Sequence, residues 1–154
     1  MRKLIHPGRD RGAAAVEFAL VLPVLVMLLV GMVDFGMATN AQAIAGNAAR
    51  DGARAASLGA KTGDACAAAL KASSSLLNFA DTGSCGSSTP SIAVTCQTAG
   101  GAACASDFDT SREIGGTAVV TVTYVYHWIS PAVLGLPGTT TITKSAYMRI
   151  ETTS

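Results

Sequence analysis

The feature that most constrains this chain is an apolar stretch from Ala13 to Val33, AAAVEFALVLPVLVMLLVGMV, whose single charged residue is Glu17. A helix of about 20 apolar residues crosses a hydrocarbon core about 30 Å thick. The sequence therefore predicts one transmembrane helix over residues 13–33. The alternative is a secretory signal cut near Ala41, but the apolar stretch is longer than the usual h-region of such signals.

Basic side chains are concentrated before this helix. Asp34 follows it directly, whereas four bases precede it, with Asp10 against them: Arg2, Lys3, Arg9 and Arg11. Positive charge marks the cytoplasmic side of a membrane helix. We therefore expect residues 1–12 to form a basic cytoplasmic leader, and the chain from residue 34 onward to lie outside the cytoplasm.

All four cysteines lie beyond the apolar stretch, and no two of them form a CxxC pair. This spacing argues against a zinc site or a thioredoxin-like redox pair. An even number of cysteines in a small, turn-rich region favours disulfides, which require an oxidising compartment. Of three possible pairings we favour Cys66–Cys85 and Cys96–Cys104, because each closes a short loop rich in Gly and Ser. The alternative, four free thiols, requires a cytosolic domain.

Glu17 needs a partner if its helix spans a membrane. A carboxylate at the centre of such a helix costs about 2.5–3.5 kcal/mol on insertion scales. Ala13 lies four residues upstream, on the same helical face. A cut after Gly12 would give Ala13 a free ammonium group, which suits Glu17 on the same or a neighbouring subunit. The alternative is that Glu17 extends to the cytoplasmic interface, toward Arg11.

The residues around Gly12 resemble the prepilin-peptidase site of type IV pilins, and in detail the TadE branch of the tight-adherence (Tad/Flp) pilus family. Members of that branch carry Gly-x-x-x-x-Glu-(Tyr/Phe), which here is Gly12 to Glu17 and Phe18, followed by Pro23 in the apolar helix. Residues 117–151 resemble the C-terminal part of these proteins. The two regions cover less than half of the chain.

This resemblance implies cleavage between Gly12 and Ala13 by a membrane-embedded aspartyl prepilin peptidase, with Glu17 and Phe18 as part of the recognised motif. It implies a minor pseudopilin that assists pilus assembly in the bacterial inner (cytoplasmic) membrane. The expected partners are the peptidase, other pseudopilins, inner-membrane pilus assembly proteins and the lipid bilayer. The alternative is an unprocessed, anchored periplasmic binding or adhesion module.

Small residues recur every three or four positions beyond the apolar stretch, at Ala38, Ala41, Ala45, Ala49, and Ala53 or Ala56. This period indicates that the helix extends through residues 34–60. A face of small residues allows close approach of another element. We expect a second helix over Asp64–Phe79, and loops over residues 81–90 and 98–109.

Three strands are predicted, at residues 91–97, 116–128 and 139–151. Because a short connection joins the last two, we expect them to pair antiparallel. The fold class is α+β: a single N-terminal transmembrane helix continues into a long pilin-like helix, packed against a small antiparallel sheet. Residues 61–154 form the extracytoplasmic α+β domain.

No motif in the sequence indicates an enzyme. It contains no GxSxG, HExxH, P-loop or dinucleotide-binding pattern. The acidic residues Asp107, Asp109 and Glu113 lack the spacing of an EF-hand and are interpreted as a solvated loop. A net charge of +1 gives no electrostatic basis for binding nucleic acid. We expect no catalytic residue, no metal and no cofactor.

Overall fold

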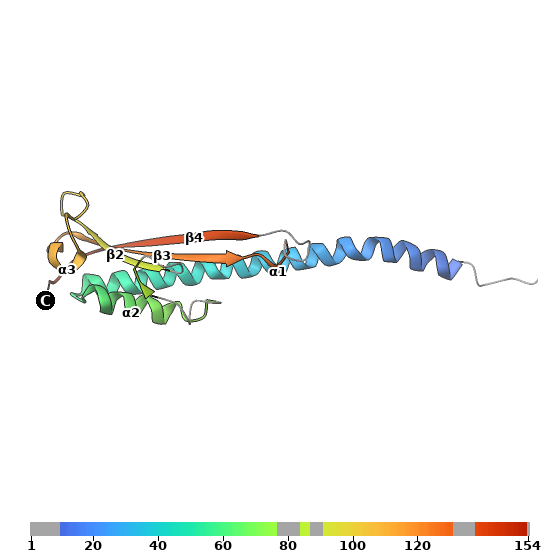
Figure 1. The fold of residues 1–154 in the computed structure, drawn as a ribbon, viewed down its shortest axis with the longest axis horizontal. Helices are drawn as coiled ribbons and strands as arrows, with labels where there is room; N and C mark the ends of the chain where they lie inside the picture. Colours follow the sequence, from blue (N-terminus) through green and yellow to red (C-terminus); the bar gives the residue numbers. More distant parts are fainter. Residues whose placement is uncertain (1–9, 77–83, 87–90, 131–137, 154) are drawn as a thin grey trace, which may run out of the picture. The chain divides into compact units, whose positions relative to one another are not determined.

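The computed structural model describes residues 10–76, 84–86, 91–130 and 138–153, with side chains from Gly12 onward (Figure 1). The chain divides into two compact units. The first consists of Met1–Gly36 and Trp128–Gly138, and the second of Met37–His127 and Thr139–Ser154. Helix α1, Asp10–Ser57, contributes residues to both.

Helix α1 has 48 residues and continues through Pro23. It ends where Gly59 adopts a positive φ of 95°, which glycine reaches without steric cost. The N–H of Ala60 donates to the carbonyl of Ala55 at 3.1 Å, and the N–H of Gly59 to that of Ala56 at 3.3 Å. These two bonds form a Schellman motif, which satisfies carbonyls that the helix itself leaves unpaired. The predicted extension of the helix is confirmed as far as Ser57.

The sheet has four strands in the order β1-β2-β3-β4. Strand β2 (Ser91–Gln97) pairs antiparallel with β3 (Thr117–His127), which pairs antiparallel with β4 (Thr139–Arg149). These three strands confirm the predicted antiparallel sheet. Strand β1, Ser84–Cys85, pairs parallel with β2 and lies in a segment that was predicted as loop. A strand of two residues is too short to show alternation of polar and apolar side chains in the sequence. Cys85 is held in this strand by a disulfide to Cys66.

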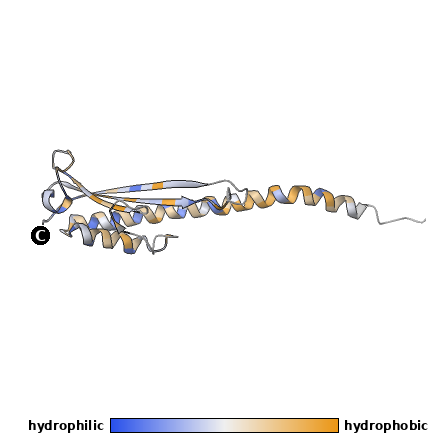
Figure 2. Cartoon of the chain, in the orientation of Figure 1, coloured by the Kyte–Doolittle hydropathy of each residue, from blue (hydrophilic) through white to orange (hydrophobic). Residues whose placement is uncertain are grey.

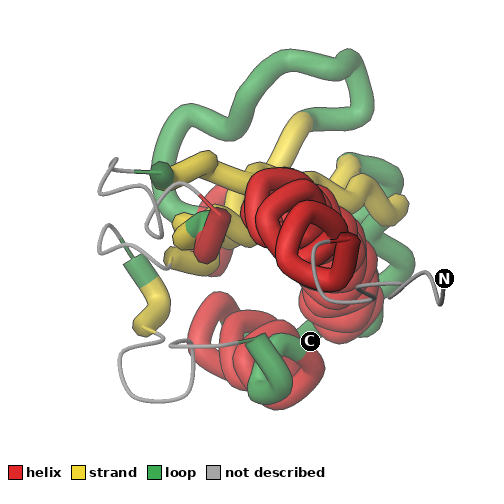
Figure 3. Tube along the Cα trace, turned by 90° about the vertical axis from the view of Figure 1, so that its right-hand side faces the viewer, coloured by secondary structure: helices red, strands yellow, loops and turns green. Residues whose placement is uncertain are grey.

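The small-residue stripe of α1 is buried in the core of the second unit. Ala45, Ala49, Ala53 and Ala56 have no exposed surface. A Cβ on Gly52 would lie 3.0 Å from both Val120 Cγ1 of β3 and Ala69 Cβ of the second helix, α2 (Thr62–Ala72). The C-terminal half of α1 therefore contacts both the sheet and the second helix, as the side-by-side ribbons in Figures 1 and 3 show. This close approach confirms the prediction that a face of small residues allows another element to pack closely against the helix.

The inner face of the sheet alternates along β3 from Val120 onward and along β4. In β3 the side chains of Val120, Val122, Tyr124 and Tyr126 are all buried, whereas the residues between them are partly exposed. Strand β4 alternates in the same way, with Ile142 and Ala146 facing inward. The two tyrosines are core residues.

Helix α2, Thr62–Ala72, is shorter than the predicted Asp64–Phe79. Ser73 explains the early end, because its hydroxyl donates to the carbonyls of Ala69 and Leu70 and its own N–H bonds to the same two carbonyls. The prediction of helix over residues 73–76 is therefore wrong, because these residues form a turn and a bend, and residues 77–79 lie outside the described residues. Helix α3, Phe108–Ser111, begins inside the predicted loop 98–109 because buried Phe108 draws the segment into the core.

The two disulfides join the cysteines that loop length favoured. Cys66–Cys85 connects α2 to β1 with Cα atoms 5.9 Å apart, and Cys96–Cys104 has a Cα separation of 5.4 Å. The second bridge lies across a tight reversal, because the N–H of Cys104 also donates to the carbonyl of Cys96 at 3.0 Å. Both geometries lie within the usual range for Cα separations.

Candidate functional site

The predicted processing residues lie on the first turns of α1. Ala13, Glu17 and Phe18 are exposed, and a side chain on Gly12 would meet nothing within 4 Å. Glu17 follows Ala13 by one turn, so the two share a face of the helix. The leader up to residue 9 and the side chain of Arg11 lie outside the described residues. The structure thus presents Gly12 and Glu17 on a helix surface free of packing constraints.

The N-terminal part of α1 exposes an apolar surface that water does not favour. Large apolar side chains from Val16 to Phe35 are exposed on all sides of the helix; Leu20 is 73% exposed and Met32 69%. Figure 2 shows predominantly hydrophobic colouring along the N-terminal part of α1. An exposed apolar surface of this extent marks a contact with lipid or with other proteins. By length and composition, α1 is a candidate single-pass membrane anchor.

Asp34, the first charged residue after this apolar surface, is buried within the first unit. One carboxylate oxygen, Oδ2, accepts from the N–H of Ile129 at 2.9 Å, from the N–H of Ser130 at 2.8 Å and from the Ser130 hydroxyl at 2.8 Å. The side chain is only 1% exposed. Three donors to an ionised acceptor offset the cost of removing the charge from water. The sequence analysis used Asp34 only as a marker of orientation and missed this contact.

Ser130 also borders an apolar groove. Among the described residues it is lined by Leu22, Pro23, Val26, Met27, Val30 and Ser130, and its volume is about 310 Å³. Five of these side chains belong to the apolar stretch of α1, and Ser130 belongs to the connection that follows β3. Ser130 therefore lies against the apolar stretch of α1.

Replacing Asp34 by alanine is expected to destabilise the protein by about 1–3 kcal/mol, because three part-buried donors lose their common acceptor. Equilibrium urea unfolding of the full chain in detergent micelles, followed by far-ultraviolet circular dichroism, measures the change. Asp51→Ala is the matched control, since Asp51 is an exposed residue of the same helix. Equal midpoints for the two variants would show that the Asp34 contacts contribute nothing to stability.

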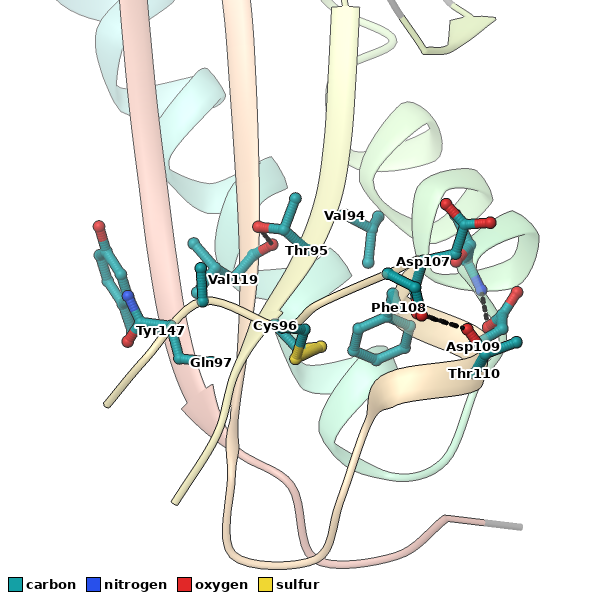
Figure 4. A pocket seen from close by; sticks show the side chains of 14 residues that line it. Val94, Thr95, Cys96, Gln97, Asp107, Phe108, Asp109, Thr110, Val119 and Tyr147 are labelled. Atoms are coloured by element: carbon teal, nitrogen blue, oxygen red, sulfur yellow. Dashed lines mark hydrogen bonds between the residues drawn. A yellow bond between two sulfur atoms is a disulfide. The ribbon is translucent and has the colours of Figure 1, made fainter. Parts of the chain in front are cut away.

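A larger hollow of about 580 Å³ lies in the second unit, beside β2 and α3 (Figure 4). Thr95, Val119 and Tyr147 stand opposite one another on three adjacent strands, and Phe108 and the Cys96–Cys104 bridge form the other part of its wall. The lining mixes hydroxyl, carboxylate, amide, aromatic and aliphatic groups.

The acidic residues near this hollow have structural hydrogen bonds. Asp109 Oδ1 accepts from the N–H of Thr62 at 2.9 Å, and Glu113 Oε1 accepts from the N–H of Ala99 at 2.8 Å. Asp109 thereby caps the first turn of α2, whose own preceding residue, Lys61, provides no cap. Within the described residues, no group of three His, Cys, Asp or Glu side chains is placed to hold a metal ion.

A smaller cleft in the second unit is bordered by α1 and the inner face of β3. Its wall includes Met37, Ile44, Leu76, Tyr124 and Tyr126. Burial raises the pKa of the Tyr124 phenol above its ordinary value of 10.0. The phenol therefore stays protonated at neutral pH and acts as a core residue with a polar end.

A comparison with known proteins gives a family match in the N-terminal region of the chain. Residues 12–54 match the family model of TadE-like proteins. The match begins at Gly12, contains Glu17 and Phe18, and extends along the small-residue stripe to Arg54. It confirms the resemblance that the sequence suggested. No curated protein and no solved structure matches the chain.

Proposed function

We propose, on the premise that residues 12–54 are TadE-like, that this protein is a minor pseudopilin of a Tad-type pilus assembly system. The observation that carries the proposal is the arrangement at the start of α1, where Gly12 and Glu17 are exposed on a helix with an uninterrupted apolar surface. The role is assembly, and it requires no catalytic group on this chain.

The proposed location is the bacterial inner membrane. Four basic residues precede the apolar stretch and Asp34 follows it, which favours a cytoplasmic N-terminus. Two disulfides in the remainder of the chain favour an oxidising compartment for it. The charge distribution and the cysteines therefore support the same orientation. The exposed apolar side chains of α1 are then available to lipid and to the helices of other pseudopilins and membrane-embedded assembly proteins.

Processing would cut the peptide bond between Gly12 and Ala13. The α-amino group released on Ala13 would lie one helical turn from the Glu17 carboxylate, within the same subunit or in a neighbour. Pairing with that ammonium would reduce the cost of keeping Glu17 in an apolar layer. Since a side chain on Gly12 meets nothing within 4 Å, a requirement for glycine here would come from the peptidase and not from the fold.

The test is the intact mass of the full chain expressed with its cognate prepilin peptidase. The wild-type protein is expected to begin at Ala13, and Gly12→Ala is expected to remain uncut. Gly31→Ala is the matched control, because Gly31 lies in the same helix and also has open space around it. Cleavage of this control together with loss of cleavage in Gly12→Ala would assign the effect to recognition at the cut site.

Two other masses would contradict the proposal. A wild-type chain that still begins at Met1 in the presence of active peptidase would indicate an unprocessed, anchored binding or adhesion module. The hollow beside Tyr147 and Phe108 is the feature that favours this second candidate. A chain that begins near Ala41 would show that the apolar stretch is a secretory signal.

A further inference from the structure

The hollow of about 580 Å³ beside β2 and α3 lies wholly within the second unit. Ligand pockets are usually clefts of about 300–1,000 Å³ that combine an apolar wall with a few polar groups. The apolar wall here includes Val119, Phe108 and the Cys96–Cys104 bridge. The hollow therefore has the size of a site for a small organic ligand.

Tyr147 provides an aromatic surface at one side of this hollow. It lies on β4, paired with Val119 of β3, which is paired in turn with Thr95 of β2 (Figure 4). The Tyr147 side chain is 63% exposed, whereas that of Val119 is only 8% exposed. Two strand spacings separate Tyr147 from Thr95, which corresponds to about 10 Å. The tyrosine is therefore accessible to a ligand that lies across the three strands.

Three polar side chains around the hollow are not used by the fold. Among the described residues, the Gln97 amide and the Tyr147 hydroxyl have no hydrogen-bond partner. Asp107 directly precedes α3, but its carboxylate provides no cap to that helix. Amides and hydroxyls both donate and accept hydrogen bonds, and an ionised carboxylate accepts them. A ligand that carries several groups able to donate and to accept would satisfy all three.

The charges near the hollow favour a neutral ligand. Among the described residues that line it, Asp107 and Asp109 are charged and none is basic, so an anion would meet only repulsion. Two exposed bases lie close by in the sequence: Lys61 directly precedes the lining residue Thr62, and Arg149 lies near the end of β4. These bases offset the two carboxylates and reduce the attraction for a cation.

We propose that this hollow binds a neutral saccharide, with one sugar ring packed against Tyr147. A pyranose ring has apolar faces of C–H groups and a rim of hydroxyls, each of which donates and accepts. The C–H groups contact the Tyr147 ring and Val119, and the hydroxyls bond to Gln97 and Asp107. The distance of about 10 Å from Tyr147 to Thr95 accommodates two linked rings. This binding activity goes beyond the proposed assembly role and does not require processing at Gly12.

The test is saturation-transfer difference NMR on the full chain. The protein is held in a polyoxyethylene detergent, because detergents with sugar head groups would occupy the site. The probes are three neutral disaccharides, cellobiose, maltose and N-acetylchitobiose, together with the polycation spermidine. We expect saturation transfer to at least one disaccharide, strongest on its ring C–H protons. Added sodium chloride is expected to leave the dissociation constant unchanged, because salt screens charges and the ligand has none.

Variants of Tyr147 locate the bound sugar. Tyr147→Ala is expected to weaken binding roughly tenfold, whereas Tyr147→Phe keeps the ring and is expected to remain within about twofold of the wild type. Thr143→Ala is the matched control, because Thr143 is an exposed residue on the same face of β4 outside the hollow. Urea unfolding of Tyr147→Ala checks that loss of this exposed side chain leaves the fold intact.

Three outcomes would overturn the inference. The first is the absence of saturation transfer to all three disaccharides, and the second is transfer to spermidine alone, which would show that the carboxylates select a cation. The third is equal binding by the wild type, Tyr147→Ala and Thr143→Ala, which would place the sugar elsewhere. The mass measurement at Gly12 is independent of all three, so failure of this inference leaves the proposed function standing, and an uncut chain leaves this inference standing.

Discussion

The Gly52→Leu variant is expected to lose about 2 kcal/mol of folding stability, although leucine is the better helix former. A Cβ at this position would lie 3.0 Å from Val120 Cγ1 and Ala69 Cβ, and 3.1 Å from the carbonyl oxygen of Ala65. Forcing a larger side chain into such a site costs about 3 kcal/mol, whereas removing a helical glycine gains about 1 kcal/mol. Steric overlap therefore dominates.

Gly46→Ala is the matched control in the same helix. A Cβ on Gly46 would meet nothing within 4 Å, so only the helix-propensity gain remains. This variant is expected to be more stable than the wild type by about 0.5–1 kcal/mol. Urea unfolding of both full-length variants in detergent micelles, followed by far-ultraviolet circular dichroism, provides the comparison. Equal shifts in the two variants would mean that α1 does not pack against β3 and α2 at Gly52.

Loss of the Cys66–Cys85 bridge in a Cys66→Ala/Cys85→Ala variant is expected to cost about 3 kcal/mol. The bridge closes a loop with a sequence separation of 19, and a cross-link of that span restricts the unfolded chain by about this amount in the loop-entropy description. The native structure is affected as well, because Cys85 belongs to β1 and Cys66 is fully buried in α2. The same unfolding experiment measures the loss.

The Cys96→Ala/Cys104→Ala variant is the comparison. Its bridge has a sequence separation of 8, for which the loop-entropy description gives about 2.5 kcal/mol. Backbone bonds across the same reversal, including that from the N–H of Thr98 to the carbonyl of Ala102, persist without the bridge. We therefore predict that the Cys66→Ala/Cys85→Ala variant loses more folding stability than the Cys96→Ala/Cys104→Ala variant. A larger loss from the Cys96–Cys104 variant would contradict it.

The apolar span and the small-residue stripe were predictable because both are periodic or continuous within one segment. Exposure of the side chains around Leu20 and burial of Ala45, Ala49 and Ala53 follow from local composition and a helical period. In the same way, alternation predicted β2 with its observed bounds, and β3 and β4 to within two residues at each end. The motif at Gly12 and Glu17 was readable because its spacing is local.

The Asp34 contact could not be predicted from local sequence patterns. Asp34 and Ser130 are 96 residues apart in the sequence, and neither residue carries a signal that points to the other. Asp109 bonds to Thr62 across 47 residues, and Arg112 donates to the carbonyl of Ala60 across 52. The sequence marked Asp109 only as part of a loose acidic group. A polar residue on a loop has many possible hydrogen-bond partners, and the sequence does not indicate which of them it contacts in the fold.

By itself, then, the sequence determined the parts of this protein whose energetics are local: a helix that must leave water, a face small enough for close packing, and strands with one buried side. The tertiary structure alone decided how those parts are joined. It paired β1 with β2, capped α2 with Asp109, and fixed Ile129 and Ser130 to α1 through Asp34. Such contacts form between residues that folding brings together from distant parts of the chain, so their energies depend on three-dimensional proximity and leave no periodic trace in the sequence.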